Sequence, residues 1–218
     1  MELKGKKINF LGDSITLGGC ASSEDKIFHA VLKKNANLAE VRNYGVGRTR
    51  IARQSEIKDL VADEDFIMRT DKMSDDADIV VVFGGTNDFG HGQASLGSFE
   101  DRTVFTFYGA MHNLIIKLIK KYLGKEIVFI TPLHRINEDG QGTWKPEGVE
   151  IKPLSEYVKA IKEVCEFYSI PVLDLFSSGS IHGNVAEWNR AFLPDGLHPN
   201  DEGHKIIADR LQKFLENL

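Results

Sequence analysis

The sequence predicts one α/β domain, a three-layer α/β/α sandwich with about five parallel strands in its central sheet. Short apolar segments typical of buried strands alternate with longer amphipathic segments along the 218 residues. A parallel connection needs a dozen or more residues and is usually a helix, so this alternation favours a parallel sheet with helices on both faces. No internal repeat or Ser/Gly-rich linker interrupts the pattern. We therefore expect residues 1–218 to form a single domain.

The predicted strands are short apolar runs that end at glycine, proline or polar residues. The first, 8–11, ends at Gly12, and 40–44 is a weaker candidate that ends at Gly45. The most strand-like run is 78–83 (DIVVVF), which is rich in β-branched residues and ends at a pair of glycines. Segments 126–130 and 170–174 repeat the pattern. These five segments account for the expected sheet.

Four segments show the apolar periodicity of helices that pack against a sheet. Ser23 can cap the first, whose apolar stripe runs through 27–32. The longest, 103–123, stops at Gly124, a common helix terminator. Ser155 can cap the third helix, and Asn200 can cap the last, which extends to about residue 215. The helices thus fall between the predicted strands and after the last one.

Composition and charge exclude several function classes. With 27 basic and 32 acidic residues, the net charge of −5 offers no cationic field for nucleic acid, so we expect no nucleic-acid partner. The longest apolar run, 79–83, cannot span a bilayer, and the charged start lacks the apolar region of a signal peptide. Cys20 and Cys165 fit no metal-ligand spacing, so we expect both to be reduced and packed. A cytoplasmic protein is expected; its oligomeric state is not indicated.

Three polar clusters follow predicted strands or precede a predicted helix. They are 12–16 (GDSIT), 84–88 (GGTND) and 195–200 (DGLHPN). All three should lie at the carboxyl edge of the sheet, where ligands of open α/β sheets bind. Taken alone, each cluster is explained by a helix cap or an Asx turn. Their joint occurrence points to a reaction.

The three clusters together supply the groups that acyl transfer needs. A serine hydroxyl attacks an ester only when a base removes its proton, and a third group must orient that base. Ser14, His198 and Asp195 can fill these roles. The oxyanion of the tetrahedral intermediate also needs donors. The Asn87 amide, the Ser14 N–H and an N–H of the loop 45–48 can provide them.

These motifs, in this order and spacing, resemble the four motif blocks of the SGNH (GDSL-type) hydrolases over residues 8 to about 215. The resemblance implies a flavodoxin-like sheet of strand order 2-1-3-4-5 and metal-independent ester hydrolysis without a cofactor. It implies Ser14 as the nucleophile, His198 as the base and Asp195 as its orienting group. Asn87 and backbone of the second block would form the oxyanion hole. The quoted blocks are Gly12-Asp13-Ser14-Ile15, the glycine loop after Asn43, Gly84-Gly85-Thr86-Asn87-Asp88 and Asp195-x-x-His198.

The second block departs from the pattern of relatives, which often reads Asn-x-Gly-x-Gly-Gly. Here the last glycine is replaced by Arg48, and its backbone N–H can donate only if the local φ and ψ tolerate a Cβ atom. Arg48 is the closer positional match for the oxyanion donor, and Gly47 is the alternative. The Arg48 side chain could instead reach an acidic substrate group or pair with Asp13 or Asp88.

The substrate is indicated only in outline. We expect the segments 134–153 and 177–192 to build the pocket, with His134, Trp144 and Trp188 as candidate substrate contacts, although packing is the simpler explanation for the tryptophans. A small acyl or acetyl group on a sugar or other small alcohol is the expected substrate. Cleavage of a lysophospholipid or a thioester by the same triad is the alternative, because no motif reveals pocket shape.

Two functions of other classes fit parts of the sequence. Asp13, Asp88, Asp195 and His198 could converge as ligands of a metal-dependent phosphoesterase, although no Asp-x-His follows the first strand. A non-catalytic module that binds a carbohydrate or an acyl group could keep the same fold. An α/β-hydrolase of the usual type is disfavoured because the Gly-x-Ser-x-Gly motif is absent.

Overall fold

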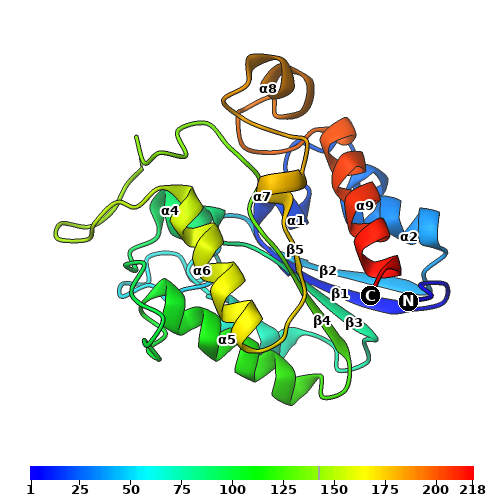
Figure 1. The fold of residues 1–218 in the computed structure, drawn as a ribbon, viewed down its shortest axis with the longest axis horizontal. Coiled ribbons are helices and arrows are strands. Elements are labelled where there is room, and N and C mark those ends of the chain that lie inside the picture. The colour runs from blue at the N-terminus through cyan, green and yellow to red at the C-terminus, as the bar shows by residue number, and fades with distance from the viewer. Residues whose placement is uncertain (142) are drawn as a thin grey trace.

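Five parallel strands form one sheet of order β2-β1-β3-β4-β5 in the computed structural model, which describes residues 1–141 and 143–218 (Figure 1). All four strand pairs are parallel. This confirms the predicted sheet, its strand order and all five strands, of which β5 is shorter than expected. The bounds are β1 Lys7–Gly12, β2 Glu40–Gly45, β3 Ile79–Phe83, β4 Glu126–Ile130 and β5 Val172–Leu173.

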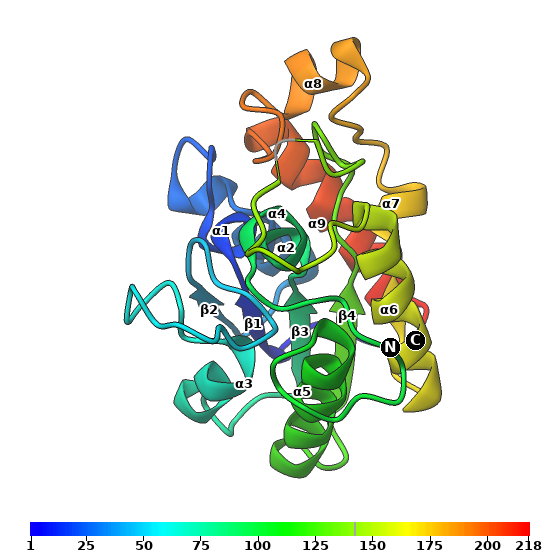
Figure 2. The ribbon, with the colours of Figure 1, turned by 90° about the vertical axis from the view of Figure 1, so that its left-hand side faces the viewer.

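Helices cover both faces of the sheet. Helices α5 (Phe107–Lys121) and α6 (Leu154–Phe167) pack on one face, and α2 (Phe28–Ala36) and α9 (Asp201–Glu216) pack on the other (Figures 1 and 2). Alternate residues of β3 serve the two sides, since Val80 and Val82 join the α5–α6 core while Val81 joins the α2–α9 core. Burial on both faces explains why these strands are continuous apolar runs.

Shorter helices occupy the connections. Helices α1 and α4 begin directly after β1 and β3, so each starts at the carboxyl edge of the sheet, whereas α8 lies at the top of Figure 1 with no buried residue. The bounds are α1 Ser14–Leu17, α3 Phe66–Arg69, α4 Thr86–His91, α7 Leu175–Ser178 and α8 Ala186–Phe192, with 3₁₀ turns η1 Glu24–Lys26 and η2 Thr70–Lys72.

Three of the four predicted helix starts shift by a few residues. Ser23 makes no capping bond because η1 takes up the residues that follow it, and α2 begins only at Phe28. Helix α5 is capped by Thr106, whose hydroxyl accepts the Gly109 N–H at 3.3 Å. Helix α6 starts one residue before Ser155. Asn200 caps α9 as predicted, with its Oδ1 accepting the Gly203 N–H at 3.1 Å.

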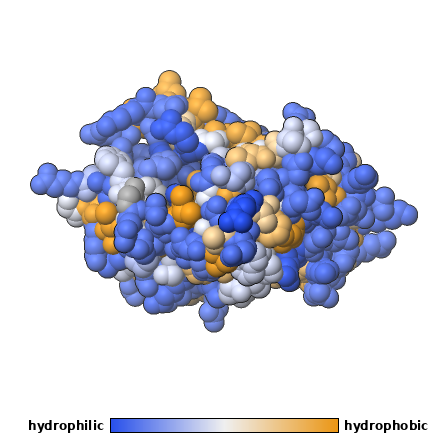
Figure 3. All heavy atoms as spheres, turned by 90° about the horizontal axis from the view of Figure 1, so that it is seen from above, coloured by the Kyte–Doolittle hydropathy of each residue, from blue (hydrophilic) through white to orange (hydrophobic). Residues whose placement is uncertain are grey.

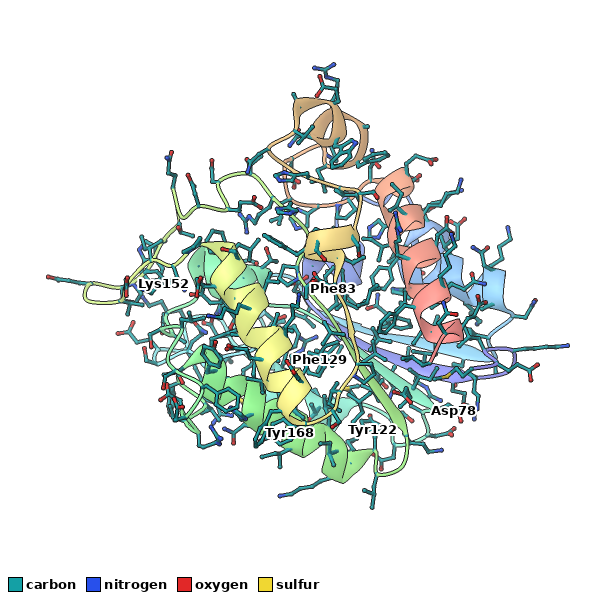
Figure 4. All side chains as sticks on the ribbon, in the orientation of Figure 1. Asp78, Phe83, Tyr122, Phe129, Lys152 and Tyr168 are labelled. Carbon is teal, nitrogen blue, oxygen red and sulfur yellow. The ribbon has the colours of Figure 1, made fainter. Side chains whose placement is uncertain are left out.

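The buried and exposed parts of the molecule differ in chemistry. Phe83, Phe129 and Tyr122 are buried, whereas Asp78, just before β3, is partly exposed towards the end of the molecule opposite α8 (Figure 4). The surface seen from the α8 side is mostly hydrophilic, with hydrophobic side chains in small patches (Figure 3). None of the helices in the described part of the chain combines the length and the apolar character that a bilayer crossing requires.

The two cysteines differ in environment. Cys165 is buried in α6, as predicted, but Cys20 is exposed. The expectation that both are packed is therefore wrong for Cys20, which follows α1 on a loop where its backbone has a positive φ of 62°. Its sulfur lies 3.9 Å from Asp195 Oδ2.

Candidate active site

Ser14 is the first residue of α1, immediately beyond the carboxyl end of β1. Asp13 caps this helix, and its Oδ1 accepts the Ile15 N–H at 2.9 Å. The helix lies close to β2, because a Cβ atom on Gly45 would fall 2.2 Å from the Leu17 backbone nitrogen. A helix start leaves its first backbone N–H groups without intrahelical acceptors. Ser14 therefore presents, from a rigid element, a hydroxyl and an N–H that has no backbone acceptor among the described residues.

His198 and Asp195 lie on the loop before α9 and meet Ser14. The Ser14 Oγ is 2.8 Å from His198 Nε2, and His198 Nδ1 is 2.6 Å from Asp195 Oδ2. Asp195 Oδ1 also accepts the backbone N–H groups of Leu197 at 2.9 Å and His198 at 2.7 Å. Partial burial opposes ionisation of Asp195, but these hydrogen bonds hold its pKa below the usual value. An ionised Asp195 thus fixes the proton of His198 on Nδ1.

Asn87 lies in the first turn of α4 and is held by hydrogen bonds on both ends of its amide. Its Nδ2 donates to the Thr49 carbonyl at 3.0 Å, and its Oδ1 lies 3.1 Å from His91 Nε2. His91 Nδ1 in turn accepts from Arg50 at 3.0 Å, which assigns the His91 proton to Nε2. Burial, followed by the charges of Arg50 and Arg48, lowers the pKa of His91 to about 4. A neutral His91 therefore orients the Asn87 amide.

The loop after β2 adds further donors. Arg48 has a φ of 66°, so its backbone adopts the left-handed conformation that the missing glycine would favour. In the described part of the chain, neither the Gly47 nor the Arg48 backbone N–H donates a backbone hydrogen bond. The Arg48 side chain pairs with neither Asp13 nor Asp88, in contrast to one sequence-based alternative. Its ion-pair partner is Asp59, at 4.0 Å.

A cavity of about 320 Å³ opens beside these groups. It contains the Ser14–His198 pair, Asn87 and two arginines. Its lining residues are Ser14, Arg48, Asn87, Gly90, His91, Arg135, Leu197 and His198. Arg48 and His91 are shared with a neighbouring cavity of about 230 Å³, which Trp144 also lines. Ser14, Asn87 and His198, which come from the three predicted clusters, thus line one cavity at the carboxyl edge of the sheet.

The predicted substrate contacts do not line the Ser14 cavity among its described lining residues. His134 does not line the Ser14 cavity, because its ring stacks on His182 at 3.9 Å between centroids and its Nδ1 lies 2.8 Å from Glu138 Oε2. Trp188 lies on α8, partly exposed, and lines neither of the two cavities. Trp144 reaches only the neighbouring cavity. Segment 177–192 contributes nothing to the Ser14 cavity lining among the described residues.

Arg135 lines the cavity although sequence reasoning did not identify it. The residue lies in the long segment 134–153, which was expected to contribute to the pocket. A lone arginine in an irregular segment carries no periodic or motif signal. The same holds for Arg50, whose bond to His91 joins the loop after β2 to helix α4.

The ligand set of a metal-dependent phosphoesterase does not converge. Asp195 and His198 lie within reach of a common ion together with Cys20, but Asp13 and Asp88 belong to no such group among the described residues. Asp88 is buried and its oxygens accept backbone N–H groups of the loop after Arg50, at 3.0 and 2.8 Å. Both aspartates therefore hold backbone segments beside the site through hydrogen bonds.

Asp13 should make stability depend on pH. Burial raises its pKa to about 6 from 3.8, so the folded protein holds this proton more tightly than the unfolded chain and loses stability as pH rises between these values. Asp13→Asn keeps the cap acceptor without the charge. At pH 8 its free energy of unfolding should exceed that of wild type by up to about 3 kcal/mol, with the difference gone below about pH 4. Urea unfolding at both pH values measures this, and a pH-independent difference would contradict it.

Comparison with known proteins agrees with this geometry. The model of the GDSL-like lipase/acylhydrolase family matches residues 10–206. A structure of a Lactobacillus plantarum protein is 29% identical, with a TM-score of 0.83 and 98% of each chain covered. The lipase/acylhydrolase from Enterococcus faecalis is 21% identical, with a TM-score of 0.68, covering 97% of this chain and 96% of that chain.

A more distant structure, a member of the lipolytic G-D-S-L family from Veillonella parvula, is 17% identical, with a TM-score of 0.61, and covers 97% of this chain and 99% of that chain. No curated protein matches the sequence significantly. The distant structures show the fold. The family model covers most of the chain, including Ser14 and His198. The chain therefore belongs to the GDSL-like lipase/acylhydrolase family and is an esterase or acylhydrolase.

Proposed function

We propose that this protein hydrolyses carboxylic esters through an acyl-enzyme formed on Ser14. The proposal is supported by the hydrogen-bonded series from Ser14 through His198 to Asp195 at the wall of a cavity. Because Asp195 accepts the Nδ1 proton, the Nε2 lone pair of His198 faces the Ser14 hydroxyl and can take its proton. Asp195 is then the orienting group and His198 the base.

The proposed reaction has two stages, acylation of Ser14 and hydrolysis of the acyl-enzyme. His198 removes the Ser14 proton while Oγ attacks the ester carbonyl carbon. The resulting oxyanion accepts hydrogen bonds from the backbone N–H groups of Ser14 and Arg48 and from the Asn87 side chain. Asn87 has one N–H for Thr49 and a second for the oxyanion. The carbon–oxygen bond then breaks and His198 protonates the departing alcohol. Water repeats the sequence, releasing the acid and free Ser14.

The proposed substrate is a small acyl or acetyl group on a sugar or other small alcohol. A cavity of about 320 Å³ lies at the small end of ligand sites, which span roughly 300–1,000 Å³. A lysophospholipid or thioester would use the same three side chains, and the lysophospholipid also requires room for a long acyl chain. The proposed steps draw on no metal ion, so a chelator should leave turnover unchanged.

Covalent trapping tests the proposal. A nitrophenyl alkylphosphonate should transfer its phosphonyl group to the Ser14 oxygen with release of nitrophenolate and loss of ester turnover. Mass spectrometry of the tryptic peptides should place the added mass on Ser14. Ser14→Ala should resist labelling, and Ser22→Ala, a matched change on the nearby loop, should be labelled like wild type. The proposal would be contradicted if the wild-type protein hydrolysed esters but the phosphonate labelled another residue or did not label the protein.

A further inference from the structure

The cavity beside Ser14 has cationic side chains in its wall and, among the described residues, no acidic ones. Arg48 and Arg135 both line it, and its other polar side chains are Ser, Asn and His. We infer that the site selects esters that carry a carboxylate or phosphate group close to the ester bond. This inference deepens the proposed function and rests on it.

The Arg135 guanidinium has N–H donors that are only weakly used by the described residues. Its Nη1 makes only long contacts to the Thr86 carbonyl oxygen at 3.4 Å and the Thr86 hydroxyl at 3.3 Å, while the guanidinium stands 5.5 Å from the centre of the Phe89 ring. Its Nε is buried without an acceptor among the described residues. A guanidinium carries five N–H donors, and the two on Nη2 have no acceptor among the described residues, so they can serve a molecule in the cavity.

Gly90 keeps the space beside Arg135 open. A Cβ atom at this position would lie 3.0 Å from Arg135 Nη1, 3.7 Å from Cζ and 3.8 Å from Nη2. Gly90 itself lines the cavity. The absent side chain therefore leaves the guanidinium in contact with the hollow where an ester would bind.

Arg48 offers a second, more exposed cation. Its side chain is 73% exposed, and its ion pair with Asp59 is long, at 4.0 Å, with Asp59 also 48% exposed. Such exposed pairs contribute little stability and exchange partners readily. An anionic group in the cavity can therefore replace Asp59 as the partner of Arg48.

Of the aspartates near the site, Asp59 pairs with Arg48 at 4.0 Å, whereas the others are bound elsewhere. Asp13 and Asp88 are buried and bind backbone N–H groups, and Asp195 binds His198. No ion pair joins any of the three to an arginine in the described part of the chain. The cavity wall therefore holds two guanidinium groups, and Asp195, Asp13 and Glu138 act on Arg135 only through longer-range charge interactions.

A planar guanidinium pairs with carboxylate and phosphate through two parallel hydrogen bonds, which makes arginine selective for these groups. A neutral ester would fill the cavity and leave the Arg135 donors desolvated without an acceptor, which is costly. The site should thus favour the anion and also disfavour its neutral isostere. Enzymes whose sites hold such buried polar groups discriminate strongly for this reason.

Pairs of esters that differ in charge test the inference. In the first pair, 4-acetoxybenzoate carries a charge on the alcohol side and 4-methylphenyl acetate is its neutral partner. In the second pair, monoethyl adipate carries the charge on the acyl side and ethyl hexanoate is neutral. 4-Acetoxyphenyl phosphate replaces the carboxylate by phosphate. After correction for hydroxide-catalysed rates, kcat/KM should favour the anionic member by about 10- to 100-fold in at least one comparison. Raising NaCl from about 20 to about 300 mM should reduce this preference.

Arg135→Met should remove most of the preference, and Arg135→Lys should retain part of it. Arg102→Met is the matched control, because Arg102 is exposed and bonds carbonyls of its own loop, and it should keep the full preference. If Arg135→Met does not fold, Arg48→Asn, which suits a positive φ, and the wild-type salt dependence take its place. A preference that survives both the arginine variants and high salt would overturn the inference.

The outcomes separate the two proposals. If wild type hydrolyses none of these esters, the proposed function fails. If it hydrolyses charged and neutral members equally well, ester hydrolysis stands and only the selectivity for anions is overturned.

Discussion

Ser14→Ala should lower kcat for an ester accepted by wild type by about 10⁴-fold or more, the largest effect expected of any single change. The substitution removes the oxygen that lies 2.8 Å from His198 Nε2, while α1 and the Asp13 cap stay intact. Without Oγ no acyl-enzyme forms, and residual turnover must come from direct attack by water. The steady-state rate of acid release measures this, with an alkyl ester chosen because it is not activated for background hydrolysis.

Ser22→Ala serves as the control for Ser14→Ala. Ser22 bonds Asp201 at the start of α9 and does not line the cavity, so its loss should leave kcat near the wild-type value. The free energy of unfolding should change little in Ser14→Ala, since the lost hydroxyl is partly exposed. Wild-type turnover by a folded Ser14→Ala protein would rule out the acyl-enzyme.

Asp195→Asn should lower kcat by about 10³- to 10⁴-fold. An asparagine oxygen can still accept the backbone N–H groups of Leu197 and His198, so its NH₂ group would face His198 Nδ1. The ring would then carry its proton on Nε2, where it donates to Ser14 and no longer accepts. Steady-state kinetics should show the loss in kcat with KM nearly unchanged, because Asp195 does not line the cavity.

Asp209→Asn is the control: it removes an exposed carboxylate on α9, the helix that follows the Asp195 loop, and it should leave kcat unaffected. Thermal unfolding of both variants should stay close to that of wild type. If Asp195→Asn retained most of its kcat, Asp195 would have no part in setting the His198 tautomer.

Much of the fold followed from local sequence chemistry. A strand buried on both faces must be almost entirely apolar, so β1, β3 and β4 stand out, and even the edge strand β2 is delimited by Gly45. Helix starts were less predictable because several residues in a row can cap a helix. The choice of Thr106 for α5 and the 3₁₀ turn after Ser23 depend on tertiary packing, which local preference does not determine.

The grouping of Ser14, Asn87 and His198 was predictable because parallel strands bring their carboxyl ends to one edge. Arg135 was not, since its position depends on the path of a long irregular segment. His134, the preceding residue, shows the difference, because it turns instead towards His182 and Glu138. Adjacent residues in such a segment share no periodicity that would tell which side chain enters a cavity.

Ser14 and His198 are separated by 184 positions in the chain, and the loop that carries His198 is held in place by α9, which packs beside α2. During refolding, activity should consequently return no earlier than the docking of this C-terminal helix, whatever spectroscopic signals recover first. An intermediate with a formed sheet but an undocked last helix would be catalytically silent, so turnover reports the final assembly step.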